Sequence, residues 1–160
     1  MTDSNARDTF HRLVSEATSA IGARPLNADL QELLNRDLGA NSRWFADMFA
    51  ACQAAIASGW MCEREAGGIR YGRVYKPAAE FNGFSVDVVD MLDVQGPHHR
   101  HPNGEIDLIM PLTQTPGAKF DGHGAGWLVY DSGSAHFPTV TNGRALVLYL
   151  LPQGAIEFTR

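Results

Sequence analysis

Apolar side chains recur through the first sixty residues at the spacing of amphipathic helices. The pattern predicts one helix over about 8–22, a second over about 27–39 and a third from Ser42 to about Ile56. Asn27 and Ser42 are typical residues at the start of a helix, because their side chains accept hydrogen bonds from its first free N–H groups. The third segment is apolar on two faces, so we expect it to be the most buried helix.

From Trp60 onward the pattern changes to short segments typical of β-strands, with Ala66-Gly67-Gly68 as a hairpin signal between the first two. The expected strands span 60–65, 69–75, 84–94, 105–110, 127–130, 145–151 and 156–158. No helical pattern alternates with them, which favours an antiparallel sandwich or barrel. The sequence therefore predicts a mainly β (α+β) protein, with a helical region over 1–59 that packs on a β-barrel domain over 60–160.

The connection after the third expected strand is dense in metal-ligand chemistry. Residues 96–107 hold three histidines and two carboxylates. In an extended segment alternate side chains share a face, so His99 and His101 project to one side together with Glu105, which follows a turn. His98 points the other way and is most simply a loop residue. Two neutral imidazoles and a carboxylate suit Zn²⁺, Fe²⁺, Mn²⁺ or Ni²⁺, so the segment predicts a divalent metal site.

The spacing His-x-His-x3-Glu resembles the first motif of the cupin superfamily, and residues 131–138 contain the Gly-x2-His core of its second motif. The resemblance implies a single antiparallel β-barrel with His136 as the fourth ligand. Asp131 stands where a proline is usual, and Asn142 lies two residues later than the typical asparagine. These departures affect turn residues and leave the ligands in place. A degenerate cupin that binds no metal is the alternative.

Two further side chains are candidates for acid–base chemistry, beside Glu105 if the metal does not bind it. Asp107 shares a face with Glu105 and is expected to orient a ligand or carry a proton, although a solvated strand residue is the alternative. His123 lies on the glycine-rich loop 121–126, where an exposed histidine is the common outcome. That loop lacks the strand–turn–helix setting of a phosphate-binding motif, so no nucleotide cofactor is expected.

Charge and composition exclude several kinds of partner. The net charge is −5, and no lysine or arginine cluster occurs, which argues against nucleic acid. The chain has no apolar run long enough to span a bilayer and no secretory signal pattern, so we expect a cytoplasmic protein. Cys52 and Cys62 are isolated, and we expect reduced thiols. The apolar third helix is expected to cover the barrel or to form a contact in a homodimer or higher homo-oligomer.

Beyond the cupin pattern, the layout is similar to that of the 4-hydroxylaminobenzoate lyases of bacterial nitroaromatic degradation. The resemblance rests on His-Arg-His-Pro-Asn-Gly-Glu-Ile-Asp from His99, Gly-Trp-Leu-Val-Tyr from Gly126 and Ser-Ala-His-Phe-Pro-Thr-Val from Ser134. It runs from about the third helix to the last strand. It implies conversion of 4-hydroxylaminobenzoate to 3,4-dihydroxybenzoate (protocatechuate) with release of ammonia and without a redox cofactor.

The small aromatic substrate that this resemblance implies carries a carboxylate, for which a bidentate arginine is the most suitable partner. The candidate arginines are Arg70, Arg73 and Arg100. The candidates for contact with the ring are Trp127, Tyr130 and Phe137. Each of these three aromatic residues is also a plausible core residue.

Two other classes of function remain open from the sequence. One is a cupin-type oxygenase that uses Fe²⁺ at the same four ligands on a small aromatic substrate. The other is a non-catalytic cupin that binds a small molecule. Ammonia release without oxygen would exclude the first class, and only an assay separates the second from an enzyme.

Overall fold

The computed structural model describes residues 3–159. The chain begins with the helices α1 (Asp3–Ile21), α2 (Ala28–Leu38) and α3 (Arg43–Ser58). The side chains of Asn27 and Ser42 accept hydrogen bonds from the N–H groups of Leu30 and Phe45, so both predicted caps are formed. Helix α1 begins earlier than predicted, because no glycine or proline interrupts residues 3–8. None of these helices is long and apolar enough to cross a membrane.

The strands that follow form two antiparallel sheets within the described residues. The larger sheet has the order β1-β2-β3-β9-β5-β7, with β6 paired to β9, and the smaller has the order β10-β4-β8. The strands of the larger sheet are β1 (Arg64–Ala66), β2 (Ile69–Tyr75), β3 (Phe84–Gln95), β5 (Glu105–Pro111), β6 (Lys119–Phe120), β7 (Gly126–Tyr130) and β9 (Thr139–Pro152). Those of the smaller sheet are β4 (His99–His101), β8 (Ser134–His136) and β10 (Glu157–Phe158). A short 3-10 helix, η1 (Ala79–Phe81), precedes β3.

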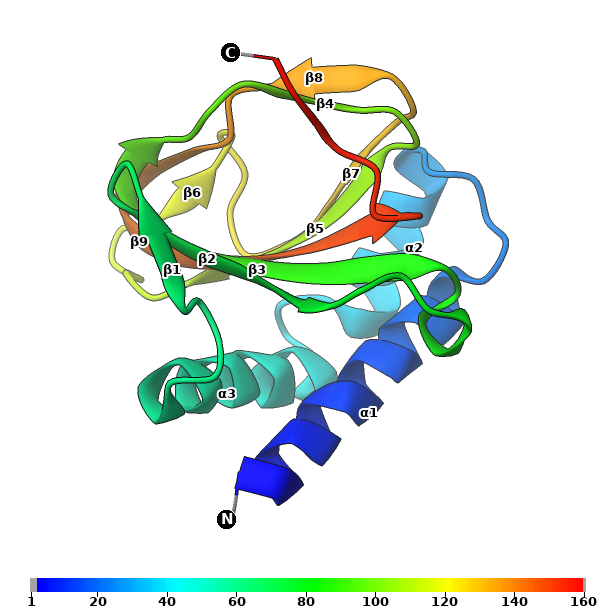
Figure 1. Cartoon of the computed structure of the whole chain (residues 1–160), viewed down its shortest axis with the longest axis horizontal. Helices are drawn as coiled ribbons and strands as arrows, with labels where there is room; N and C mark the ends of the chain where they lie inside the picture. Colours follow the sequence, from blue (N-terminus) through cyan, green and yellow to red (C-terminus); the bar gives the residue numbers. More distant parts are fainter. Residues whose placement is uncertain (1–2, 160) are drawn as a thin grey trace.

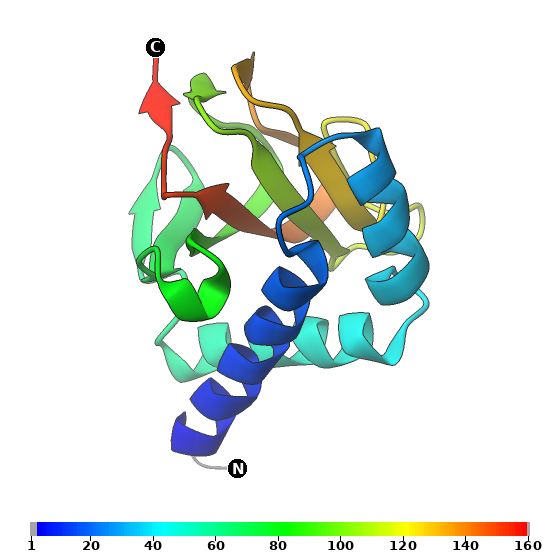
Figure 2. The ribbon, with the colours of Figure 1, turned by 90° about the vertical axis from the view of Figure 1, so that its right-hand side faces the viewer.

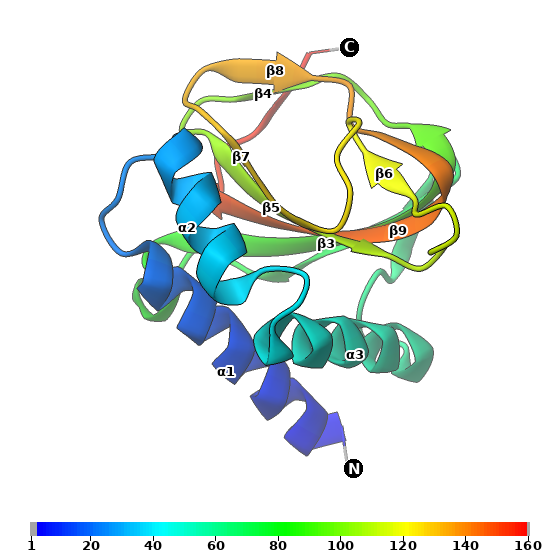
Figure 3. The ribbon, with the colours of Figure 1, turned by 180° about the vertical axis from the view of Figure 1, so that it is seen from behind.

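The molecule has three layers. The helices α1 and α3 pack on one face of the larger sheet, α2 lies along its edge at β7, and the smaller sheet lies over the opposite face (Figures 1 and 3). Figure 2 shows α1 and α3 beneath the strands and α2 beside them. The mainly β class with a helical N-terminal region is confirmed. The two sheets do not join into one closed barrel, so the β-layers form a sandwich.

Two apolar clusters explain the long hydrophobic run in β9. Leu146, Leu148 and Leu150 belong to the cluster between the helices and the larger sheet. The alternate residues Val147 and Tyr149 belong to the second cluster, inside the sandwich. Because successive side chains on a strand point to opposite faces, a strand covered on both sides is apolar throughout. The interior cluster forms the floor of the candidate site.

The first predicted strand is shorter than expected. Residues Trp60, Met61 and Cys62 are buried in the cluster shared with the helices and stand outside any strand, and β1 begins only at Arg64. Cys62 has a φ of 56°, which is incompatible with an extended strand. These residues therefore connect α3 to the hairpin formed by β1 and β2.

Candidate metal centre

Four predicted ligand side chains converge between the two sheets. His99 and His101 lie on β4, Glu105 begins β5, and His136 ends β8 directly opposite His99 in the register of the small sheet. One ligand atom from each residue lies within 4.8 Å of the others. The segments 99–105 and 134–136 therefore bring three imidazoles and one carboxylate to a single point, which is the ligand set of a divalent metal.

The glycine in the turn between β4 and β5 allows this convergence. Gly104 has a φ of 86°, and a Cβ added there would lie 2.6 Å from Leu26 Cδ2 and 2.7 Å from the carbonyl oxygen of Tyr130. Any larger residue would meet both strain and a steric clash. The turn thus returns the chain tightly enough for Glu105 to face the two histidines on β4.

Several polar atoms at the centre lack ordinary partners, although the Nε2 atoms of His99 and His136 lie 3.1 Å from each other. The Nε2 atoms of His99, His101 and His136 lie 3.6, 3.3 and 3.7 Å from the nearest carboxylate oxygen of Glu105. None of these contacts is a hydrogen bond, and both Glu105 oxygens and His101 Nε2 are buried without a hydrogen-bond partner in residues 3–159. Buried polar atoms without partners are costly. A cation bound among them would satisfy them together, so the donor set fits a metal ion.

The outer nitrogens of two histidines are held by protein acceptors. The Ser134 hydroxyl donates to the carbonyl oxygen of Asp131 at 2.7 Å, and it therefore accepts from His101 Nδ1, which lies 2.9 Å away. His136 Nδ1 lies 2.5 Å from Oδ2 of Asp121. Both contacts place the proton on Nδ1, which leaves the Nε2 lone pairs directed at the centre. For these two histidines the protein thus favours the tautomer that a metal requires.

The two buried carboxylates of β5 have opposite protonation behaviour. Burial raises the pKa of Glu105, but the nearby imidazoles of His101 and His99 outweigh this effect and lower the pKa to about 2. Burial and the adjacent negative charge of Glu105 raise the pKa of Asp107 well above its ordinary value. Asp107 is completely buried, and neither of its oxygens has a hydrogen-bond partner in the described chain. Glu105 is therefore suited to bind a cation as a carboxylate, whereas the surroundings of Asp107 favour its protonated form.

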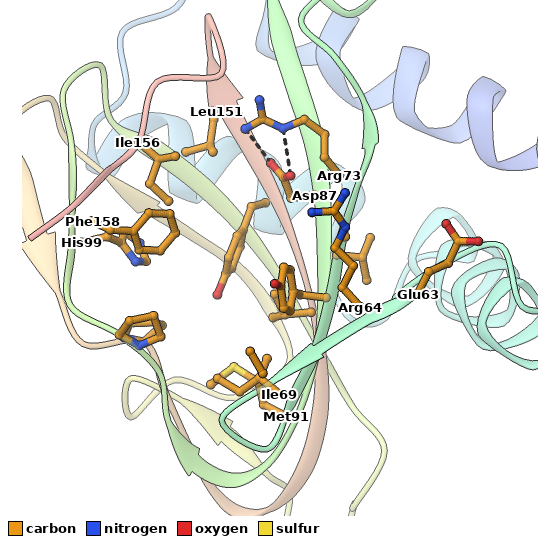
Figure 4. A pocket seen from close by; sticks show the side chains of 18 residues that line it. Glu63, Arg64, Ile69, Arg73, Asp87, Met91, His99, Leu151, Ile156 and Phe158 are labelled. Atoms are coloured by element: carbon orange, nitrogen blue, oxygen red, sulfur yellow. Dashed lines mark hydrogen bonds and ion pairs between the residues drawn. The ribbon is translucent and has the colours of Figure 1, made fainter. Parts of the chain in front are cut away.

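A pocket opens from this centre between the two sheets. Its volume is about 640 Å³. His99 and Phe158 line one side, and residues of β1, β2 and β3 line the other (Figure 4). Tyr71 and Tyr149 contribute aromatic surface. The pocket is large enough for a single-ring aromatic molecule and adjoins the metal ligands through His99.

The three arginines predicted to bind a carboxylate occupy different surroundings. Arg73 lines the pocket, but its guanidinium donates to both oxygens of Asp87, at 3.0 and 3.3 Å. Arg70 does not line the pocket, whereas its neighbours in β2 do, so alternation directs its side chain to the other face of the sheet. Arg100 forms an ion pair with Glu157 at 3.0 Å and also lies outside the pocket lining.

The predicted aromatic contacts are divided between the two faces. Trp127 is buried, donates its indole N–H to Leu38 and stacks on Trp44, so it faces the helices. Tyr130 lies among the ligands, with its ring centre 5.3 Å from that of His101 and 4.6 Å from that of His136.

The remaining two candidates lie near the surface. Phe137 is 48% exposed and packs on His98. His123 is exposed on the loop after β6, where its backbone pairs with Phe120. The structure therefore does not bring His123 to the ligands or into the pocket lining.

The sequence-based prediction missed two residues beside the centre and one on the far side of the pocket. Asp121 and Ser134 contact the outer nitrogens of His136 and His101, and Arg64 lines the pocket. The Asp-Gly-His-Gly loop was a usable signal for Asp121, but only its histidine was selected. Arg64 gave no signal, because its side of the hairpin depends on the register opposite Tyr71.

Comparison with known proteins agrees with the ligand pattern. A family model described as 4-hydroxylaminobenzoate lyase matches residues 12–158. A 4-hydroxylaminobenzoate lyase from Nocardioides sp. (strain LMS-CY) is 33% identical over 144 residues, covering 84% of each chain. One from Pseudomonas putida is 31% identical over 171 residues, covering 96% of each chain.

Among solved structures, the DMSP lyase DddQ from Ruegeria pomeroyi DSS-3 aligns with a TM-score of 0.51 and 17% identity, covering 99% of this chain and 98% of that one. At this identity the likeness concerns the fold. The two-sheet sandwich with the His-His-Glu-His cluster between its sheets is a cupin fold, as the two motifs predicted. The family model and the two relatives cover most of the chain, and the chain belongs to the 4-hydroxylaminobenzoate lyase family.

Proposed function

We propose that this protein converts 4-hydroxylaminobenzoate to 3,4-dihydroxybenzoate with release of ammonia, and that a divalent metal bound by His99, His101, Glu105 and His136 assists the reaction. Family membership supports the reaction class. The observation that carries the metal role is the outer contact of two ligand histidines, His101 to Ser134 and His136 to Asp121, which directs both Nε2 lone pairs inward. The candidate metals are Fe, Mn, Zn and Ni.

The proposed reaction is balanced without an oxidant. Loss of the hydroxylamine oxygen as water breaks the N–O bond and leaves the ring electron-poor. One water then adds to the ring carbon next to the carbon that bears nitrogen, and a second replaces the imine nitrogen as ammonia. The net change is the addition of one water, because the N–O bond supplies the two oxidising equivalents. Neither a nicotinamide nor molecular oxygen is consumed.

Within this reaction a bound metal would supply Lewis-acid help at oxygen. Asp107 is the residue that we propose as the proton carrier, because it is buried, has no hydrogen-bond partner among the described residues and shares the inward face of β5 with Glu105. A carboxylic acid at that position can protonate the departing hydroxyl oxygen. Glu105 acts as a ligand in this account, and we assign no step to His123, which is exposed.

The pocket walls supply binding and exclusion of water. Tyr130 lies beside His101 and His136, where we propose that it helps to orient the reacting end of the substrate. Tyr149 and Tyr71 line the pocket and offer flat surface to the ring. Because the walls are mainly apolar or aromatic, bulk water is displaced when an aromatic substrate enters.

Three broader expectations are also proposals. We propose a cytoplasmic location, supported by two buried free cysteines, and a homo-oligomer, supported by the exposed apolar residues Leu92 and Phe158. We also propose the division into a helical region, 1–59, and a cupin domain, 60–160. Since the helices share one apolar cluster with the larger sheet, residues 60–160 alone should aggregate. Size-exclusion chromatography of the full and shortened chains tests the proposed homo-oligomer and the proposed division of the chain.

The experiment for the proposed activity is a stoichiometric assay under nitrogen. Purified protein reconstituted with each candidate metal in turn is incubated with 4-hydroxylaminobenzoate, and ammonia and the catechol are quantified. Equal amounts of both products without NAD(P)H or oxygen are expected. A requirement for oxygen would identify an oxygenase, and tight binding of the substrate without turnover by any metal form would indicate a binding protein.

A further inference from the structure

The carboxylate of the proposed substrate lies at the opposite end of the ring from the nitrogen that reacts. If the reacting end lies at the metal ligands, the carboxylate must reach the far side of the pocket. In Figure 4 that side carries two arginines, Arg64 and Arg73, across from His99 and Phe158. The question is which guanidinium is free to bind an anion.

Arg73 is already occupied. It donates from Nε and Nη2 to the two oxygens of Asp87 and has a longer contact from Nη2 to the carbonyl oxygen of Gly154, at 3.4 Å. The Asp87 side chain is only 18% exposed, so its charge is poorly screened and belongs to this pair. An incoming carboxylate near Arg73 would meet a neutral ion pair and would have to compete with Asp87.

Arg64 differs from Arg73 in that its guanidinium has no acidic partner within residues 3–159. It lines the same pocket from β1, is exposed, and makes no hydrogen bond or ion pair to any residue between 3 and 159. The neighbouring acid Glu63 directs its carboxylate away from Arg64 in Figure 4. Tyr71 stands directly opposite Arg64 in the β1–β2 register and also lines the pocket. A planar guanidinium free to form two parallel hydrogen bonds is well suited to a carboxylate.

We propose that Arg64 binds the ring carboxylate of the substrate and makes the site selective for aromatic acids. This inference rests on the proposed function for the substrate's identity, but its binding test is independent of turnover. Arg73 fixes β2 to β3 through Asp87 and is a positioning residue. The sequence-based candidates Arg70 and Arg100 have no part in carboxylate binding in this account.

The test compares Arg64→Gln with Arg73→Gln and with a control, Arg43→Gln, on the distant helix α3. Binding of the unreactive analogue 4-aminobenzoate, and of aniline as its carboxylate-free counterpart, is measured by calorimetry on metal-loaded protein. Arg64→Gln should weaken 4-aminobenzoate binding by about 10- to 100-fold, as expected for loss of charged hydrogen bonds, and should leave the weaker aniline binding within about twofold. The control should change neither constant.

Steady-state kinetics provide the second readout. For 4-hydroxylaminobenzoate, Arg64→Gln should raise KM by about the factor by which it weakens 4-aminobenzoate binding, about 10- to 100-fold, and should change kcat much less. The reason is that the carboxylate contact is made equally in the ground and transition states. Phenylhydroxylamine should be affected little. Thermal unfolding should be unchanged for Arg64→Gln and lowered for Arg73→Gln.

Three outcomes would overturn the proposal. The first is that Arg64→Gln lowers the affinities for 4-aminobenzoate and for aniline equally. The second is that Arg73→Gln, and not Arg64→Gln, lowers the affinity for 4-aminobenzoate alone, and the third is that the wild-type protein does not bind 4-aminobenzoate. If the protein binds 4-aminobenzoate through Arg64 but turns over no aryl hydroxylamine, the carboxylate site stands and the proposed reaction fails.

Discussion

The Nδ1 atom of His136 lies 2.5 Å from Oδ2 of Asp121, and the same oxygen accepts a hydrogen bond from the Tyr130 hydroxyl. The other oxygen accepts the backbone N–H of Thr139 at 2.9 Å. Partial burial raises the pKa of Asp121, but these hydrogen bonds outweigh it and hold the pKa below its ordinary value. Asp121 is therefore an ionised acceptor that fixes the ring of His136 with Nε2 toward the ligand centre.

Replacing this acceptor should weaken metal binding without removing a ligand. For Asp121→Ala we expect a loss of about 10- to 100-fold in metal affinity, which is typical when the partner of a ligating histidine is removed. Competition with a chelator of known affinity measures it. Asp47→Ala, on the surface of α3, is the matched control. An unchanged affinity in Asp121→Ala would show that the contact has no role at the metal.

Replacing the proposed ligand His136 should lower metal binding more than replacing its hydrogen-bonding partner Asp121. His136→Ala leaves three of the four ligands, so we expect bound metal to fall well below one per chain. Elemental analysis after gel filtration checks this result. His123→Ala is the control, because it removes an exposed histidine close in sequence to Asp121 and should retain full metal content. Full metal content in His136→Ala would contradict the assignment.

Acidification should release the metal by protonating imidazole rather than carboxylate. The pKa of Glu105 is about 2, so this ligand stays ionised throughout the ordinary range. Imidazole binds a metal only as the neutral ring, so protons compete with the metal for its lone pair. We therefore expect metal affinity to fall as the pH is lowered from 8 to 5. Affinity measured from pH 8 to pH 5 that stays constant would exclude histidine ligands.

Even an alanine side chain at Gly104, in the turn between β4 and β5, should destabilise the protein. Gly104→Ala adds a Cβ at 2.6 Å from Leu26 Cδ2 in a residue with positive φ. We expect a loss of about 2–4 kcal/mol in the free energy of unfolding, measured with urea. Gly67→Ala, in a hairpin glycine that also has positive φ but no atom within 4 Å of the added Cβ, should cost only about 1 kcal/mol. Equal costs would mean that the clash at Gly104 relaxes freely.

The elements that local chemistry specifies could be predicted from the sequence. Asn27 and Ser42 cap helices as their side chains allow. His99, His101 and Glu105 share a face because strand alternation and a tight turn require it. Motif spacing then located His136, and all four residues meet at one point.

Features that depend on tertiary contacts could not be predicted in the same way. Trp127 lies on a strand covered on both faces, so an apolar pattern could not tell the pocket from the helical layer. Arg64 lies at the pocket because it stands opposite Tyr71 in the β1–β2 register, and the sequence does not specify that pairing. Asp121 contacts His136 although the two residues are 15 positions apart in the sequence, with β7 between them, and no local pattern predicts that contact.

The origin of the two phenolic oxygen atoms shows directly whether the reaction adds water or uses molecular oxygen. Metal-loaded protein is incubated with 4-hydroxylaminobenzoate under ¹⁸O₂ in ordinary water, and in parallel under nitrogen in H₂¹⁸O, and the catechol is analysed by mass spectrometry. We expect no label from ¹⁸O₂, label from water in both phenolic oxygens, and ammonia equal in amount to the catechol. Incorporation of ¹⁸O from molecular oxygen would contradict this expectation.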